Sequence, residues 1–476
     1  MTTLIPKYYQ GSAGSVNRAI NLKLAEIISV LDFGADPTGA TDSTAAMQAA
    51  HNTGKTIFYP AGTYKFTSIT MSTGGIVGAG VPDTILAPYS SATSTAITCS
   101  TTTNVQYGPT FMNFLMQPTI TKTAGAMIAI SASGSGNYAG TQIENVVMFQ
   151  SIFNGITIDL DANWFVTNCT FANISNACIT IQNSNNPDSG GGSITNSVFK
   201  NGGTGGNMIG ILQYSAGGQI TQGNSFLGMN YHYKIAFNAT TNNSADFIFQ
   251  NNYCGLAVVS CIDVSRTVTN SYVMSGIQII GNKFEQNVTG SGATCIKFNT
   301  SSANYVNGVY IQSNVFWPGN GNAIVLNNVN GPKITGNSFL GNNNASYYAY
   351  TIASTCVNTY VAGNNFDGFL TSGSNSGPSG STFIDGAVQS GSSTATTNAA
   401  YGSLYTGASA TITFPCPYQA APNVIATLVD GTGSGGISAM VGNVTATTFV
   451  VNVVGVTNAK ALQFNWQASG QLSVGV

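Results

Sequence analysis

The nine residues ITGNSFLGN, at positions 334–342, are one copy of a phrase that this chain repeats. Near-copies are IIGNKFEQN from Ile279, IQSNVFWPG from Ile311 and VAGNNFDGF from Val361. Aligning the copies on their aromatic residue gives intervals of 22 to 32 residues, which are typical of a solenoid. The aligned aromatics are Phe149, Phe171, Phe199, Phe226, Tyr253, Phe284, Phe316, Phe339 and Phe366.

A second repeated segment lies between these aromatics. Its copies are GITID from Gly155, CITIQ from Cys178, KIAFN from Lys234, CIDVS from Cys261, CIKFN from Cys295 and AIVLN from Ala323. Both segments alternate apolar and polar residues, which predicts half-buried strands. Strands that repeat in one direction without helices between them can stack about 4.8 Å apart. The repeat therefore predicts a parallel β-helix with inward columns of Ile and Phe and a structural ladder of Asn at its turns.

Composition limits the function. Only 6% of the 476 residues are charged and the net charge is -2, so the basic surface of a nucleic-acid-binding protein is missing. No run of about 18 apolar residues predicts a membrane span, and the N-terminus lacks the pattern of a secretion signal. The eight cysteines occur singly, so we expect buried thiols and neither a metal site nor another cofactor.

The chain divides into four segments by composition. Residues 1–30 are expected to form a neck or attachment segment with a short helix in SVNRAINLKLAEIIS. Residues 31–370 carry the β-helix, and Asp42 or Ser43 can cap a helix that plugs its first coil. Residues 371–399 are rich in Gly and Ser, which favours a linker. Residues 400–476 alternate again as strands.

The beginning of the β-helix carries a family resemblance. VLDFGADPTGATDSTAAMQAA from Val30 and KTIFYPAGTYKF from Lys55 resemble the opening segment of the pectate-lyase-like superfamily of right-handed β-helices found in bacteriophage tailspikes. The stretch DPTGATDST departs from the usual Gly-Asp-Gly pattern, and Asp32, Asp36 and Asp42 are interpreted as turn and cap residues. The resemblance implies an all-β, right-handed, single-stranded parallel β-helix on a virion tail, attached to the baseplate or another tail protein through its N-terminus.

The C-terminal segment resembles the small antiparallel β-sandwich at the tip of phage fibres, which is similar to H-type lectins. The matching phrase is Asn465, Trp466, Ala468 and Gly470, with Ser469 where an aliphatic residue is usual. This resemblance implies a homotrimer and a sugar-binding tip, in which Trp466 is either a core aromatic or part of a sugar platform.

Candidate site residues come from the outward positions of the coils, where an extended polysaccharide can lie. The first group has Asp263, Glu285 and Asp246 as catalytic carboxylates, because glycoside hydrolysis uses two of them. Asp263 matches Lys297 on the next coil, so we expect these two side by side. Aromatic, Arg and Lys side chains of the same stretch are expected to bind substrate: Tyr231, His232, Tyr233, Arg266 and Lys297. The alternative is that Asp263 and Lys297 form an ordinary surface ion pair and that the nearby tyrosines are exposed without binding a ligand.

A second group of candidate substrate-binding residues comes from the early coils. It consists of Glu144, Asp159 and Asp161 beside Trp164, with turn chemistry as the alternative.

The function expected from repeat and resemblance together is binding and depolymerisation of a bacterial surface polysaccharide, capsule or O-antigen. Hydrolysis is favoured over a metal-free lyase reaction, and no cluster of Asp suits the calcium of pectate lyases. The competing hypothesis is a non-catalytic adhesin, in which the β-helix is only a stalk.

Overall fold

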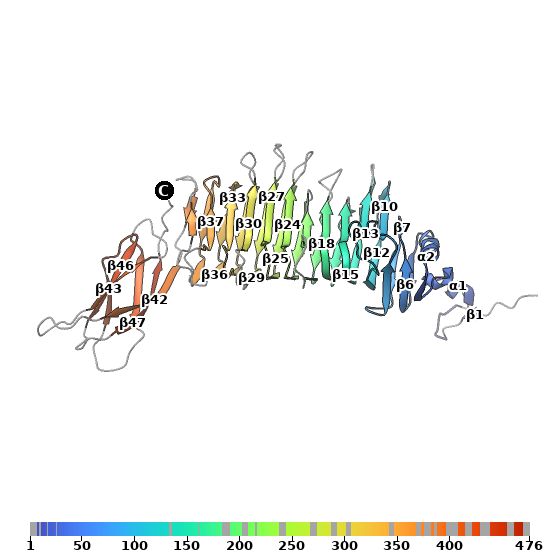
Figure 1. Ribbon diagram of the computed structural model, residues 1–476, viewed down its shortest axis with the longest axis horizontal. Coiled ribbons are helices and arrows are strands. Elements are labelled where there is room, and N and C mark those ends of the chain that lie inside the picture. The colour runs from blue at the N-terminus through green and yellow to red at the C-terminus, as the bar shows by residue number, and fades with distance from the viewer. Residues whose placement is uncertain are drawn as a thin grey trace, which may run out of the picture. The chain divides into compact units, whose positions relative to one another are not determined.

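A computed structural model represents the chain, and it describes the following residues: 7–8, 11–16, 18–24, 26–132, 136–159, 161–182, 191–201, 208–214, 217–237, 244–266, 274–286, 293–300, 306–341, 347–367, 373–375, 382–384, 388–396, 408–414, 421–428, 438–454 and 461–469. The chain forms two compact units, Met1–Leu212 and Gln213–Val476. The coils of each unit are built from parallel strands that pair with strands one coil away, as predicted for a right-handed parallel β-helix (Figure 1).

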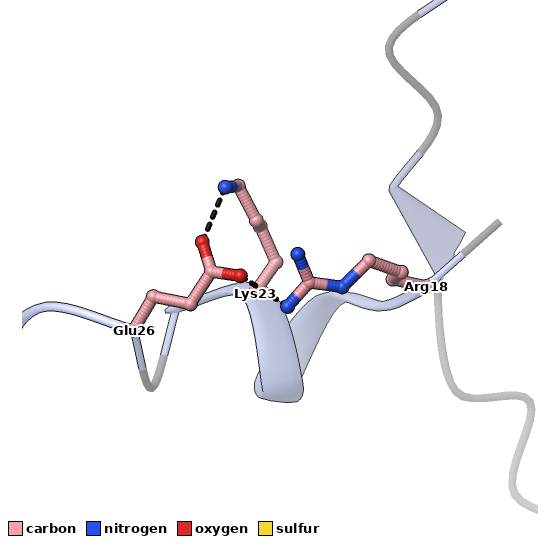
Figure 2. Close-up of polar contacts among 3 residues, drawn as sticks. All are labelled: Arg18, Lys23 and Glu26. Atoms are coloured by element: carbon pink, nitrogen blue, oxygen red, sulfur yellow. Dashed lines mark hydrogen bonds and ion pairs between the residues drawn. The ribbon is translucent and has the colours of Figure 1, made fainter. Parts of the chain in front are cut away.

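The first unit opens with short elements that precede its coils. Among the described residues of the helix predicted at 15–29, those of α1 (Ile20–Leu24) are helical, so the helix is shorter than expected. Glu26, just after α1, forms ion pairs with Arg18 and Lys23 (Figure 2). Ser29 caps the 3-10 helix η1 (Val30–Phe33).

The predicted turn and cap roles of the N-terminal aspartates are confirmed. Asp32 closes a capping box with Ser29, and Asp36 accepts hydrogen bonds from the backbone and hydroxyl groups of Thr38 and Thr41. These bonds hold the pKa of Asp36 well below its usual range. Asp42 accepts from the Thr44 backbone at the start of α2 (Thr44–His51).

The strands of the first unit are β1 (Lys7–Tyr8), β2 (Arg18–Ala19), β3 (Ile28–Ser29), β4 (Thr38–Asp42), β5 (Thr56–Tyr59), β6 (Gly62–Phe66), β7 (Ile69–Met71), β8 (Gly75–Gly78), β9 (Thr84–Pro88), β10 (Ile97–Thr101), β11 (Asn104–Val105), β12 (Thr110–Met116), β13 (Ala126–Ala132), β14 (Asn137–Ala139), β15 (Gln142–Asp159), β16 (Asp161–Ala162), β17 (Phe165–Thr167), β18 (Thr170–Gln182), β19 (Ser193–Thr195), β20 (Val198–Lys200) and β21 (Ile209–Gln213), the last reaching the boundary. β15 is long because it runs through two bends, where Asn145, Gln150 and Ser151 have positive φ.

The coils of the second unit have three strands each, and every strand pairs with its equivalent on the next coil. Sheet A is β22 (Gln219–Gln222), β25 (Ser244–Gln250), β28 (Met274–Ile280), β31 (Val306–Gln312), β34 (Val329–Asn330), β35 (Lys333–Thr335), β38 (Thr359–Ala362) and β41 (Thr382–Ile384). Sheet B is β23 (Ser225–Leu227), β26 (Tyr253–Gly255), β29 (Lys283–Glu285), β32 (Val315–Trp317), β36 (Ser338–Leu340) and β39 (Asn365–Asp367). Sheet C is β24 (Tyr231–Phe237), β27 (Ser260–Arg266), β30 (Thr294–Thr300), β33 (Ile324–Asn327), β37 (Tyr350–Ile352) and β40 (Gly373–Asn375).

The predicted Asn ladder runs along the bend between sheets A and B. Each side-chain oxygen accepts from the backbone and side-chain amides of the preceding rung, as Asn314 Oδ1 does from Asn282 N and Nδ2 at 2.8 and 3.0 Å. Asn282 Nδ2 also donates to Phe249 O at 2.8 Å. The ladder consists of Asn224, Asn252, Asn282, Asn314, Asn337 and Asn364, all buried.

The aromatic column is confirmed for most of its predicted members. Phe284, Phe316, Phe339 and Phe366 stack with ring centroids 4.9 to 5.1 Å apart, and Phe171 stacks on Phe199 in the first unit. Two members are wrong. Cys254 and not Tyr253 pairs with Phe284, and Met148 and not Phe149 pairs with Phe171. The residue two places after the ladder Asn faces inward, and in the Asn252 coil that residue is Cys254.

The cysteines behave as small apolar side chains. Cys99, Cys169, Cys178, Cys254, Cys261, Cys295 and Cys356 are buried without disulfides, and Cys416 lies outside the described residues. Within the described part of the chain, no three His, Cys, Asp or Glu side chains gather as metal ligands. None of its helices has the length and apolarity needed to cross a membrane.

The C-terminal strands form two antiparallel sheets. One is β42 (Val388–Thr396), β47 (Ala461–Ser469) and β44 (Asn423–Leu428), and the other is β43 (Ala408–Thr413), β46 (Thr448–Val454) and β45 (Ser438–Gly442). Trp466 is 6% exposed and packs edge-on against Phe449 at 5.3 Å, so it is a core aromatic and not a sugar platform. Segment 371–399, predicted as a linker, contains β40, β41 and β42, which pair in parallel with the preceding coil through backbone groups.

Candidate functional site

A row of three charged side chains crosses sheet C. Lys234 on β24 is in register with Asp263 on β27, and Asp263 is in register with Lys297 on β30. These residues alternate with inward residues of their strands, so all three face outward. The predicted pairing of Asp263 with Lys297 is therefore confirmed, and Lys234 extends the row to a third coil. We call Lys234, Asp263 and Lys297 the charged row.

Asp263 is an unusual carboxylate for an outward position. It is only 8% exposed, and burial raises its pKa above the usual value, while Lys234 and Lys297 oppose that shift. Among the described residues the ion pairs are those of Glu26 and Glu285, so Asp263 has neighbouring lysines without a close ion pair. The structure thus holds a carboxylate of raised pKa between two cations, an arrangement suited to proton transfer near a bound anion.

The aromatic and basic residues expected around Asp263 divide into exposed and buried ones. Tyr231 is half-buried, with Lys234 Nζ 4.6 Å from its ring centroid. His232 is fully buried against Phe226, and Tyr233 is buried and donates its hydroxyl to Gln213. Burial keeps the pKa of His232 low, at about 3. His232 and Tyr233 therefore cannot contact a ligand outside the coil, which corrects their expected role.

Arg266 is also buried. It is 4% exposed and lies over the ring of Phe237, with 5.0 Å between the guanidinium carbon and the ring centroid. It pairs in register with Phe237 and Thr300, both of which are buried, so it belongs to the inward side of sheet C. Its position does not suit the predicted contact with a sugar carboxylate.

The carboxylates predicted with Asp263 lie on other sheets. Asp246 is an exposed residue of β25 on sheet A with φ 63°, and it precedes Gly276 and Gly308, which share its left-handed conformation one and two coils later. Asp246 is thus a turn residue of a column otherwise made of glycine. Asp246, Asp263 and Glu285 do not form one site, because the three strands of a coil face three directions.

Glu285 belongs to a separate cluster on sheet B. Its carboxylate is 2.9 Å from Lys283 Nζ and accepts from Tyr253 Oη at 3.2 Å. The bond from Lys283 is the main reason for the lowered pKa of Glu285. Gly255 permits this approach, since a Cβ there would meet the Tyr253 hydroxyl at 2.9 Å. Trp317, 39% exposed, is in register with Glu285 on the next coil.

The second predicted group is also separated. Glu144 lies near the start of β15 and Asp159 at its end, 15 residues along the same strand and beyond its two bends. Asp161 pairs through its backbone with Tyr138 on β14. Trp164 is 2% exposed and packs where a Cβ on Gly192 would collide with it, so it is a core residue. Its neighbour Phe165 is the exposed aromatic.

Comparison with known proteins finds a family model that matches part of this chain. Residues 27–257 match the family described as rhamnogalacturonase A/epimerase, pectate lyase-like. This segment is therefore similar to a pectate-lyase-like family over just under half of the chain. No curated protein sequence matches the chain.

Several solved structures are similar to this chain at low sequence identity. The Streptococcus pneumoniae surface protein and adhesin PfbA is similar with TM-score 0.54 and 16% identity, covering 73% of this chain and 98% of that one. A double mutant of the tailspike protein of E. coli bacteriophage HK620 has TM-score 0.45 and 13% identity, covering 98% and 97%. The A-module of Azotobacter vinelandii mannuronan C-5 epimerase AlgE6 has TM-score 0.46 and 13% identity, covering 74% and 96%.

Sequence reasoning named Lys234 in the stretch around Asp263 but missed two outward aromatics of this β-helix, Trp317 and Phe165. Lys234 is the first letter of KIAFN, whereas Asp263 and Lys297 are the third letters of their copies, so aligning the copies on their first letter hid the register of Lys234 with Asp263. Trp317 and Phe165 each follow a buried aromatic, Phe316 and Trp164. Because side chains alternate along a strand, the neighbour of a column residue faces outward, and that rule would have found both.

Proposed function

We propose that this protein is a phage tailspike whose sheet C binds an acidic bacterial surface polysaccharide and cleaves it at Asp263. The observation that carries the proposal is the charged row, in which two lysines flank a carboxylate of raised pKa on consecutive coils. The family match supports polysaccharide processing, since its description names a rhamnogalacturonase and an epimerase. The phage setting is supported by the sequence resemblance of the segment from Val30 to Phe66 to tailspikes.

The row fits an acidic glycan better than a neutral one. Lys234 and Lys297 are two coils apart, so their ammonium groups are separated by roughly 10 Å along the stack. Each can bind one uronic acid carboxylate of an extended chain that runs along the coils. Tyr231, half-buried beside Lys234, offers an aromatic face to the same chain.

Two cleavage reactions compete for this row. Hydrolysis, favoured from the sequence, needs a second carboxylate within about 5 to 9.5 Å of Asp263. Its register neighbours are lysines, and Val325 and Thr351 follow Lys297 along the same row. Elimination at a uronic acid needs instead a cation on the sugar carboxylate and groups that accept and donate protons. The two lysines and the carboxylate of the charged row can meet these needs, which favours elimination over hydrolysis.

In elimination, one lysine of the charged row takes the C5 proton while the other holds the uronate carboxylate, the C4–O4 bond breaks and a C4=C5 double bond forms. The departing O4 then needs a proton, and Asp263 lies beside it as the proton donor, a role that the raised direction of its pKa favours. A lysine bound to the uronate carboxylate stabilises the negative charge that develops as C5 loses its proton.

The assembly is proposed as a homotrimer on the virion tail, attached through residues 1–30 to the baseplate or another tail protein. The C-terminal resemblance to trimeric fibre tips supports the trimer, which light scattering of the purified protein tests directly. A stable monomer would contradict it.

The experiment on function uses purified protein and a panel of uronic-acid polysaccharides, including alginate, polygalacturonate and capsular polysaccharides. Reducing ends report cleavage, and absorbance of the unsaturated uronate separates elimination from hydrolysis. Asp263→Asn should abolish both signals while binding persists, and Lys234→Met with Lys297→Met should weaken binding. Lys333→Met, on sheet A, is the matched control and should match the native chain.

Each outcome has a clear meaning. Reducing ends without the absorbance favour hydrolysis. Binding without either signal favours the non-catalytic adhesin and overturns cleavage. Binding that survives loss of both lysines overturns the assignment of sheet C.

A further inference from the structure

A hollow on the outward face of the first unit is separate from the charged row. It has a volume of about 420 Å³, within the range of small-ligand sites. Its outward lining comes from three adjacent strands in two register columns, which are Gln142, Phe165 and Ser193 in one and Glu144, Thr167 and Thr195 in the other.

The lining combines an aromatic face with hydrogen-bonding groups. Phe165 is 45% exposed, which is high for a large apolar side chain in the middle of a strand face. Single exposed apolar residues are common, but here Phe165 forms part of a hollow whose other outward groups are amide, hydroxyl and carboxylate. A pyranose ring matches such a surface, because it has an apolar face and a polar hydroxyl rim.

The polar groups still have bonding capacity. No hydrogen bond or ion pair of the Glu144 carboxylate occurs within the part of the chain that the structure describes, so both oxygens can accept from hydroxyl groups. Thr195 donates to Thr167 at 3.0 Å, which leaves the Thr167 hydroxyl proton available to a ligand. Glu144 and Phe165 are diagonal neighbours about 8 Å apart, far enough for one sugar ring to lie on Phe165 and reach Glu144.

Charge separates this hollow from the charged row. Its lining has one carboxylate and no Lys or Arg, so it repels uronic acids and accepts hydroxyl or amide donors. We propose that the hollow is a second, non-catalytic glycan site that binds a neutral or N-acetylated sugar. Phe165 stacks on the ring and Glu144 accepts hydrogen bonds from its hydroxyl groups.

The test is calorimetric titration with neutral hexasaccharides of glucose, galactose and N-acetylglucosamine, supported by saturation-transfer NMR. The native chain should bind at least one of them. Phe165→Ala should weaken that binding roughly three- to tenfold through loss of stacking, and Glu144→Gln should weaken it as well. Val198→Ala, an exposed apolar residue of the same unit outside the lining, is the matched control and should bind normally.

Several results would overturn the site. They are absence of binding by every neutral probe, unchanged binding in Phe165→Ala, and a loss of neutral-sugar binding in Lys297→Met as large as in Phe165→Ala. A change of oligomeric state in Phe165→Ala without sugar binding would mean that a second copy of this chain covers the hollow. Cleavage of acidic polysaccharide by Phe165→Ala should stay unchanged, so failure here is distinguishable from failure of the proposed function.

Discussion

Asp263 of β27 lies directly beside Lys297 of β30, its register partner one coil later. The two side chains share an outward row without forming an ion pair, and Asp263 is nearly buried there. A buried carboxylate without a close counter-ion costs stability once it ionises. Such a cost is typical of a group that serves chemistry, which is the role proposed for Asp263.

The first prediction concerns the pH dependence of Asp263. Its pKa is raised in the folded chain, so the folded state loses stability as pH rises from the ordinary Asp pKa through the raised one. Asp263→Asn removes this loss. The gain in unfolding free energy over the native chain should be larger at pH 7 than at pH 3, as urea unfolding at both pH values would show. Cleavage should fall by at least about 100-fold. An equal gain at both pH values would contradict the raised pKa.

The second prediction concerns the Asn ladder. Asn282→Ala removes bonds to Phe249 and Asn314 and leaves the backbone amide of Asn252 without its acceptor, while Asn252 Nδ2 keeps its bond to Thr221 O. We expect a loss of about 2 to 4 kcal/mol in unfolding free energy, because buried partners are left unsatisfied. Asn365→Ala, exposed one residue after the ladder Asn364, is the control and should change stability by less than about 0.5 kcal/mol. Equal effects in urea unfolding would refute a structural ladder.

The third prediction compares two adjacent aromatics. Phe316 is fully buried and stacks on Phe284 and Phe339, whereas Trp317 is 39% exposed. Phe316→Ala should cost about 3 to 5 kcal/mol and lower the melting temperature strongly. Trp317→Ala should cost less than about 1 kcal/mol. Calorimetry of both variants measures the two losses of stability. A larger loss in Trp317→Ala than in Phe316→Ala would contradict the assignment of Phe316 to the buried column.

The fourth prediction concerns acid stability. The chain has two histidines, and burial lowers the pKa of His51 to about 4 and that of His232 to about 3. As pH falls below about 6.5, the unfolded chain takes up these protons and the folded chain does not, so stability falls. His232→Phe keeps the contact with Phe226 and removes one of these groups. Its unfolding midpoint should fall less between pH 7 and pH 5 than that of the native chain, and an identical fall would contradict the assignment.

The repeat could be predicted from the sequence because inward packing tolerates few residue types. Ile and Phe recur in the core of the coil and Asn recurs at the bend, so the spacing of the repeats was enough to predict the Asn ladder and most of the aromatic column. Cys254 and Met148 were missed because an aromatic happened to stand beside the column position. The pairing of Asp263 with Lys297 was also predicted from the repeat, because equivalent positions of successive copies lie side by side on neighbouring coils.

The candidate site was predicted less well. Asp246, Asp263 and Glu285 are close in sequence yet belong to sheets A, C and B. Histidine, arginine and tryptophan often bind sugars, but the side chains of His232, Arg266 and Trp164 are buried here and cannot reach a ligand on the surface. Outward residues follow no recurring pattern, so sequence spacing alone does not indicate exposure.

The sequence by itself determined that this chain winds into a β-helix, because a periodic inward pattern leaves stacked coils as the arrangement that buries every copy. Only the tertiary structure decided which outward side chains share a face. The chain bends between the strands of each coil, so residues a few places apart in sequence can lie on different faces. Residues about 30 places apart lie side by side on hydrogen-bonded strands of neighbouring coils.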